Sequence, residues 1–129
     1  MKTRELTLVV MRGRMAVCRF PPDADVPRWT GIRGFTSVTR TSEELSVVCR
    51  QDQVPGDVRA ELEWALIKIQ GPLQFGLTGL LDTLLGPLAK AGIPVFTIST
   101  YDTDYLMVKV DNLEKAMQIL GRFCNIVYA

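Results

Sequence analysis

The chain has 129 residues, of which 47% are hydrophobic and 22% charged, which is the composition of one globular unit or two very small ones. The formal net charge of +1 lacks the basic excess that nucleic-acid binding requires, so we expect no nucleic-acid partner. No apolar run approaches the ~18–20 residues needed to span a bilayer, so we expect no membrane partner. The charged N-terminus leads directly into a strand pattern without the features of a signal peptide, which predicts a cytoplasmic protein.

Residue types that usually support catalysis or metal binding are scarce. The sequence has no histidine, which removes the commonest general base and the commonest metal ligand. The three cysteines, Cys18, Cys49 and Cys124, include no C-x-x-C pair, so neither a zinc site nor a disulfide framework is expected. We therefore predict that the protein is not an enzyme and that it holds no cofactor and no metal.

The first half of the chain has the pattern of short strands separated by turns. Runs rich in apolar and β-branched residues predict strands at 6–11, 15–20, 35–39 and 45–49. Arg12-Gly13-Arg14 is typical of a tight turn, and the polar stretch 40–44 joins the last two strands. Residues 23–31 have room for one helical turn. We therefore expect a small sheet unit in this half.

Two amphipathic helices are predicted in the second half. The first has an apolar stripe at helical spacing, formed by Leu77, Leu80, Leu81, Leu84, Leu85 and Leu88. Leu81 and Leu84 are expected to be deeply buried, and Gly92 is a suitable left-handed residue to end this helix. Asp111 is the expected cap of the second helix, with Glu114 as its capping-box partner. The buried stripe of the second helix is expected to contain Leu113, Ala116, Met117 and Leu120.

The order of elements predicts the fold class. In residues 62–129 the order is β-α-β-β-α-β, the split βαβ or ferredoxin-like arrangement, with helices on one face of an antiparallel sheet. A gapless shift of sixty residues places Phe35–Thr39 on Val95–Ser99, which indicates an internal repeat. We therefore predict an α+β protein of two tandem ferredoxin-like units, residues 1–61 with a shortened helix and residues 62–129.

A glycine-rich segment, residues 71–79, leads from a predicted strand into the N-terminus of the first helix. The free N–H groups and the dipole of a helix N-terminus favour an anion such as a carboxylate. Gly76 and Gly79 would let a ligand approach the backbone closely. The segment has neither a Walker A nor a G-x-G-x-x-G pattern, so nucleotide binding is not indicated. A plain strand-to-helix loop capped by Thr78 explains the same residues without a ligand.

A second polar segment, residues 99–105, joins two predicted strands. Asp102 and Asp104 are two positions apart, so both would point to one face of an extended chain. Two carboxylates could act as acid and base or hold a cation. The alternative is an Asp-rich hairpin turn. Taken together, a helix N-terminus for a carboxylate and an aspartate for an ammonium would match the two ends of an amino-acid zwitterion.

Two stretches of the sequence resemble the ACT-domain family. Residues 72–110 contain the runs Pro-Leu-Gln-Phe-Gly-Leu-Thr-Gly and Ile-Ser-Thr-Tyr-Asp-Thr-Asp-Tyr, and residues 34–49 resemble a first unit of the same kind. More narrowly, the chain resembles bacterial two-ACT proteins related to the CASTOR arginine sensors. ACT domains are commonly regulatory amino-acid sensors, so the resemblance implies a non-catalytic module that binds a free amino acid. The arginine sensors differ in having an acid at the position of Leu77 and four ACT units rather than two.

The resemblance also implies a ligand site where two C-terminal ACT domains meet. One domain would contribute the backbone of Pro94 and Val95. The other would contribute the loop that follows Gly76, with Leu77, Thr78 and Gly79, together with Thr100, Tyr101 and Asp104. Because the chain has one good copy of this domain, we expect a homodimer. The alternative is an interaction module that binds no ligand and whose surfaces only dimerise or dock a partner.

Overall fold

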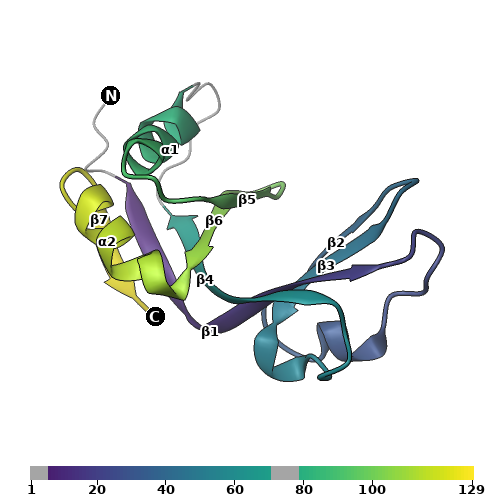
Figure 1. Ribbon diagram of the computed structural model, residues 1–129. Helices are drawn as coiled ribbons and strands as arrows, with labels where there is room; N and C mark the ends of the chain where they lie inside the picture. The colour runs from purple at the N-terminus through teal and green to yellow at the C-terminus, as the bar shows by residue number, and fades with distance from the viewer. Residues whose placement is uncertain (1–5, 71–78) are drawn as a thin grey trace. The chain divides into compact units, whose positions relative to one another are not determined.

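The computed structural model describes residues 6–70 and 79–129 of the chain (Figure 1). In these residues the α-helices have 11 residues each, and most of the strand pairs are antiparallel. Neither helix is long and apolar enough to cross a bilayer. The prediction of a mixed α/β protein with antiparallel strand pairing is confirmed.

The chain divides into two compact units. The C-terminal unit combines residues 1–12 with residues 65–129, and the N-terminal unit consists of residues 13–64. Two long strands, β1 (Thr7–Phe20) and β4 (Ala60–Gln70), contribute to both units because a unit boundary falls within each strand.

The C-terminal unit contains both α-helices. Its elements follow β4 in the order α1 (Leu80–Lys90), β5 (Phe96–Ser99), β6 (Asp104–Lys109), α2 (Val110–Leu120) and β7 (Asn125–Tyr128). This is the predicted β-α-β-β-α-β order. The strand order in the sheet of this unit is β7-β1-β4-β6-β5.

The position of β1 in this sheet was not predicted. The first part of β1 lies between β4 and β7 and pairs in parallel with β7, from Thr7 opposite Asn125 to Val10 opposite Tyr128. The sheet therefore includes a strand from the start of the chain, in addition to the elements predicted in residues 62–129.

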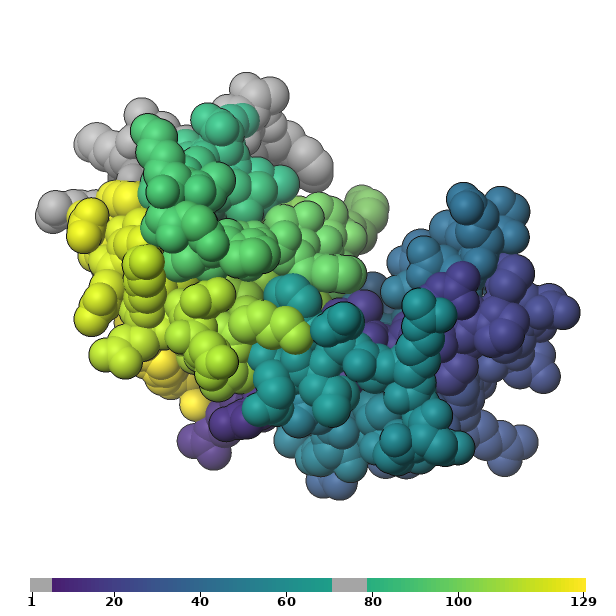
Figure 2. Space-filling view, viewed as in Figure 1, coloured from purple at the N-terminus to yellow at the C-terminus, as the bar shows by residue number. Residues whose placement is uncertain are grey.

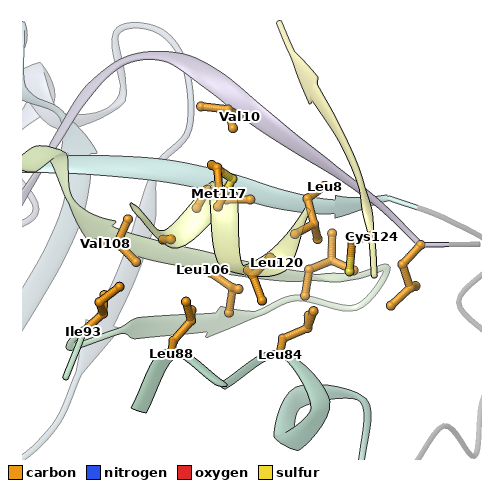
Figure 3. Close-up of a cluster of buried hydrophobic side chains, with 14 of the residues drawn as sticks. Leu8, Val10, Leu84, Leu88, Ile93, Leu106, Val108, Met117, Leu120 and Cys124 are labelled. Atoms are coloured by element: carbon orange, nitrogen blue, oxygen red, sulfur yellow. The ribbon is translucent and has the colours of Figure 1, made fainter. Parts of the chain in front are cut away.

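The core of the C-terminal unit lies where the two helices meet one face of the sheet (Figure 3). Alternate residues of the strands point toward the helices, because successive side chains of a strand point to opposite faces. The buried strand residues of this cluster include Leu8, Val10, Ile67, Ile69, Leu106 and Val108, and the helices add Leu80, Leu84, Leu88, Ala116, Met117 and Leu120. Burial of one such leucine or isoleucine contributes about 1.5–3 kcal/mol, so this cluster fixes both helices on the same face.

The apolar stripes of the helices are confirmed for the described residues, which exclude Leu77, but some of the predicted residues are less deeply buried than expected. Leu84 is fully buried, as predicted, whereas Leu81 is only partly buried at the margin of the core. Leu113 of α2 is also only partly buried. The line of residues 80, 84 and 88 faces the sheet directly, and Leu81 lies one helical step to its side.

The helix ends show one further correction. Gly92 follows α1 with φ of +74°, as the predicted left-handed residue. The N-cap of α2 is Lys109, and no side chain makes a capping hydrogen bond there. Asp111 lies inside the first turn of α2, so the predicted capping box is wrong. The carboxylate of Asp111 instead lies near the positive end of the helix dipole.

The N-terminal unit is a small sheet with short 3-10 turns. It contains β2 (Ser37–Arg40), β3 (Leu45–Arg50) and the 3-10 turns η2 (Arg28–Gly31) and η3 (Gln51–Gln53). Its strand order is β2-β3-β1-β4. The helical turn predicted within residues 23–31 is confirmed by η2.

The predicted turn at Arg12-Gly13-Arg14 is wrong, because β1 continues through these residues. Gly13 has φ of +84° within the strand. A Cβ atom at this glycine would lie 2.8 Å from Nε of Arg50 on the neighbouring strand β3. Gly13 therefore marks an irregularity in the backbone of one strand, where the side chain of Arg50 lies close to it. From the sequence pattern, such a glycine cannot be distinguished from a glycine in a turn.

Two hairpins of the same register lie in the two halves of the chain. In the first hairpin Ser37 pairs with Val48, and in the second Phe96 pairs with Met107. The two pairs are 59 positions apart at both strands. The strand pairing thus corresponds to an offset of 59 residues, one fewer than the sixty that apolar similarity predicts, because apolar similarity does not report which residues pair.

Candidate functional site

The loop between β5 and β6 is held in one conformation by its own hydrogen bonds. The N–H of Thr100 donates to the carbonyl of Thr103 at 2.8 Å, and Oγ1 of Thr100 donates to the same carbonyl at 3.0 Å. The N–H of Thr103 in turn donates to Oγ1 of Thr100 at 3.2 Å. Threonine and serine hydroxyls stabilise turns in this way, so the loop is an ordered turn of the hairpin.

Two further contacts fix this loop to the sheet. Oγ1 of Thr103 donates to the carbonyl of Ile69 at 2.5 Å, which ties the hairpin to the end of β4. Oγ of Ser99 donates to Oδ1 of Asp104 at 2.5 Å, across the first paired residues of the hairpin. The carboxylate of Asp104 is therefore oriented by a neighbouring hydroxyl.

Tyr101 lies at the tip of this loop and is 97% exposed. An aromatic ring that is fully solvated on a hydrogen-bonded loop exposes apolar area that a ligand or a second protein surface could cover. Among the predicted site residues, Thr100, Tyr101 and Asp104 thus lie together on one hairpin. Asp102 lies in the same loop, but the loop bends between Asp102 and Asp104, so the spacing rule for extended chain does not apply to them.

Of the other predicted site residues, those that the structure describes lie near the two ends of α1. Gly76, Leu77 and Thr78 lie outside the described residues. Gly79 is the N-cap of α1 with φ of +90°, and its carbonyl accepts a hydrogen bond from Oγ1 of Thr83 at 2.9 Å. Beyond the other end of the helix, Pro94 is exposed, whereas Val95 is partly buried against the core.

A pocket of about 330 Å³ lies beside the β5–β6 loop. Its lining combines the end of β4 with this hairpin and comprises Lys68, Ile69, Gln70, Thr100, Asp102, Thr103 and Tyr105. Sequence reasoning selected Thr100 but missed Lys68 and Gln70, because these residues lie on a strand that is distant in sequence. The only local signal was the polar character of alternate positions in an otherwise apolar strand.

A second hollow of about 490 Å³ lies between α1 and α2, whose atoms adjoin on the face shown in Figure 2. Its apolar floor comes from Pro87, Ala91 and Ile119, and its rim holds three cationic side chains and an amide, Lys90, Lys115, Arg122 and Gln118. Within the described part of the chain, none of these three cations forms an ion pair. This hollow is called the basic groove.

The described residues offer little for covalent or metal chemistry. Within 6–70 and 79–129, no group of three Cys, Asp or Glu side chains is placed to hold a metal ion. The three cysteines are free and buried. A hydrogen bond from Cys49 lowers the pKa of Cys18, and the same bond together with burial raises the pKa of Cys49. Burial raises the pKa of Cys124. The contact of Cys18 with Cys49 lies in the core of the N-terminal unit.

Two family models match the chain. An ACT-domain model matches residues 59–122, and a model of an N-terminal domain matches residues 13–57. A crystal structure of a protein from Agobacterium tumefaciens is 35% identical and has a TM-score of 0.92, covering 97% of this chain and 94% of that chain.

Two more distant similarities are with a curated protein and with a further solved structure. The Homo sapiens "cytosolic arginine sensor for mTORC1 subunit 1" is 31% identical over 97 residues, which are 70% of this chain and 27% of that protein. The chain thus matches about a quarter of the length of this relative. The regulatory subunit of aspartate kinase from Thermus thermophilus shares the fold at 14% identity, with a TM-score of 0.61 over 92% of this chain and 95% of that chain. ACT domains are regulatory modules, and this chain belongs to the ACT-domain family.

Proposed function

We propose that the protein is a non-catalytic regulatory module that binds a free amino acid where the ACT domains of two copies meet. The observation that supports this most is the β5–β6 loop, which presents Tyr101 at 97% exposure on a turn held by three internal hydrogen bonds. A second copy would cover this ring and enclose the ligand. The human relative is named as a cytosolic arginine sensor, which supports a sensing role in the cytoplasm.

The proposed ligand site uses opposite charges at its two ends. The ammonium or a cationic side chain of the ligand would bind Asp104, whose carboxylate is oriented by Ser99. The carboxylate of the ligand would bind N–H groups at the start of α1, where Gly79 is the N-cap. Gly76, Leu77 and Thr78 belong to this proposal from the sequence alone. Pro94 and Val95 of the second copy would complete the site.

We also propose that the chain arose as two tandem ferredoxin-like units, 1–61 and 62–129. Three features support this proposal. The two hairpins share their register at an offset of 59 residues, their loops both begin with a threonine, and η2 stands where the first unit would have its first helix. The N-terminal unit then contributes a scaffold whose helices are reduced to 3-10 turns.

A thermal-shift scan of the twenty amino acids, combined with sedimentation, tests the proposal. A ligand at 100 times its dissociation constant stabilises a protein by about 2.7 kcal/mol, so a true ligand gives a clear shift. We expect one or a few amino acids to raise the melting temperature and the protein to sediment as a dimer. A strictly monomeric protein, or no shift with any amino acid, would contradict the proposed site.

The second candidate function is an interaction module that binds no small ligand. The basic groove favours it, because three cations that form no ion pair with any described residue surround an apolar floor, which suits an acidic segment of a partner protein. A protein without any amino-acid response, but with a dimer or complex that weakens steeply with salt, would support this second function.

A further inference from the structure

The two faces of the C-terminal sheet differ in what they present at its hairpin end. Along β4, Ile67 and Ile69 point to the helices, so Lys68 and Gln70 point to the opposite face. Along β6, Leu106 points to the helices. The residues at 104 and 106 share one face of β6, and the residue at 105 lies on the other. The pocket of about 330 Å³ therefore opens on the face opposite to that of Asp104.

This pocket contains two opposite charges that do not neutralise each other. Lys68 and Asp102 both line it, yet they form no ion pair with each other, so their charged atoms lie more than 4.0 Å apart. Neither side chain has a hydrogen-bond partner among the described residues. A cation and an anion that line one small pocket without pairing are complementary to a ligand that carries both charges.

The remaining polar groups favour a small, hydrogen-bonding ligand. The hydroxyls of Thr100 and Thr103 are already engaged within the loop and with β4. The amide of Gln70 adds a donor and an acceptor beside Lys68. The volume of about 330 Å³ is at the lower end of the range typical of small-molecule sites.

We propose that this pocket is a second amino-acid site, in which Lys68 binds the carboxylate of the ligand and Asp102 binds its ammonium. This inference rests on the proposed function in one respect only, which is that the ligand is an amino acid. The proposal assigns both charges of the ligand to residues of a single chain, so it requires no second copy. The site at the ACT–ACT interface requires a second copy, and it requires Asp104. The two sites are therefore separable by mutation and by dilution.

The experiment is calorimetric titration of the Asp104→Ala variant with each of the twenty amino acids, with and without Lys68→Gln or Asp102→Asn. Asp25→Asn and Arg28→Gln are matched controls, because both residues are exposed and neither lines the pocket or the basic groove. We expect Asp104→Ala to retain binding of one ligand per chain at any protein concentration. Each pocket substitution then weakens that binding about tenfold or more, and the controls do not.

Ligand analogues identify which charge each residue binds. The carboxamide of the ligand lacks the carboxylate charge, and its N-acetyl derivative lacks the ammonium. In the Asp104→Ala background both analogues bind about tenfold more weakly than the amino acid. Lys68→Gln abolishes the discrimination against the carboxamide, and Asp102→Asn abolishes the discrimination against the N-acetyl derivative. A merely structural role for either residue would weaken all three ligands equally and would overturn the proposal.

The remaining outcomes separate the two sites. If the unmodified protein binds an amino acid and Asp104→Ala does not, the pocket proposal fails and the interface site stands. If Asp104→Ala binds as tightly as the unmodified protein and the pocket substitutions abolish binding, the interface site fails and the pocket stands. If neither protein binds any amino acid, both proposals fail.

Discussion

Thr41 and Thr100 occupy the same position in two hairpins, 59 residues apart. The N–H of Thr41 donates to the carbonyl of Glu44 at 2.9 Å, and the N–H of Thr100 donates to the carbonyl of Thr103 at 2.8 Å. The side chain of each threonine also accepts a hydrogen bond from a backbone N–H inside its own loop. The two loops therefore share one backbone design, and they differ in the side chains they present.

That difference supports the choice of the second hairpin for the proposed sites. The loop after Thr41 presents Ser42 and two glutamates, whereas the loop after Thr100 presents Tyr101 and Asp102. Two hairpins with the same backbone and different loop side chains are expected when one hairpin supports the fold and the other contacts a ligand.

The first prediction concerns Asp104. Replacing it with alanine should weaken amino-acid binding at the interface site by about 2–5 kcal/mol, the range for removal of one partner of a buried charge pair. The stability of the unliganded protein should change little, because the carboxylate bonds only to exposed Ser99 among the described residues. Calorimetry measures the affinity and denaturant unfolding measures the stability. Asp25→Ala is the matched control. Unchanged affinity in Asp104→Ala would contradict the interface site.

The second prediction compares two neighbouring leucines of α1. Leu84→Ala should lower the free energy of unfolding by about 2–5 kcal/mol, because it opens a cavity in a fully buried site. Leu81→Ala should cost less, because Leu81 is only partly buried and water can fill the space. Urea unfolding of both variants provides the comparison. Equal losses in the two variants would show that the helix faces the sheet differently.

The third prediction concerns the hydrogen bond from Thr103 to the carbonyl of Ile69. Thr103→Val keeps the shape of the side chain but leaves that carbonyl without its donor, which should cost about 1–3 kcal/mol. Thr103→Ser retains the hydroxyl and should cost clearly less. Hydrogen exchange of the β5–β6 hairpin, together with urea unfolding, measures the effect. Similar behaviour of the valine and serine variants would mean that the hydroxyl does not hold the hairpin to β4.

The fourth prediction contrasts two glycines. Gly13→Ala should destabilise the protein by about 1–2 kcal/mol, because an L-residue is strained at the positive φ of this strand position. The close side chain of Arg50 is flexible and can shift, so the backbone is the larger cause. Gly86→Ala should instead stabilise by about 0.5–1 kcal/mol, since it lies in α1 with open space around it. Thermal unfolding of both variants distinguishes the expected loss of stability from the expected gain.

The fifth prediction concerns pH. Burial raises the pKa of Cys124, so the folded state holds the thiol proton more tightly than the unfolded state. The contribution of this thiol to the free energy of unfolding is fully present below the pKa of the unfolded thiol, about 8.5. It is lost as pH rises above that value. The difference in unfolding free energy between the unmodified protein and Cys124→Ala should therefore shrink between pH 8 and pH 10, values that bracket that pKa of about 8.5. A difference that stays constant across this range would contradict the assignment.

Local patterns in the sequence predict most of the elements correctly. The helical spacing of leucines predicts α1, and the same reasoning predicts α2, because an amphipathic stripe has one stable orientation on a sheet. The strands β2, β3, β5 and β6 follow from apolar runs bounded by polar turns. The polar loop 99–105 is likewise identified from its composition, and three of the predicted site residues lie together on its hairpin.

Only the tertiary structure decides how distant segments pair. The continuity of β1 through Gly13 and its position between β4 and β7 depend on backbone hydrogen bonds such as the one from Asn125 N–H to Leu6 O at 2.9 Å. The pocket lined by Lys68 and Asp102 likewise joins a residue of β4 to a residue of the β5–β6 loop. Periodicity identifies which face of an element is apolar, but it does not identify the element that packs against that face. Pairing between residues far apart in the chain is set by the packing of the whole sheet, so the sequence pattern alone could not predict it.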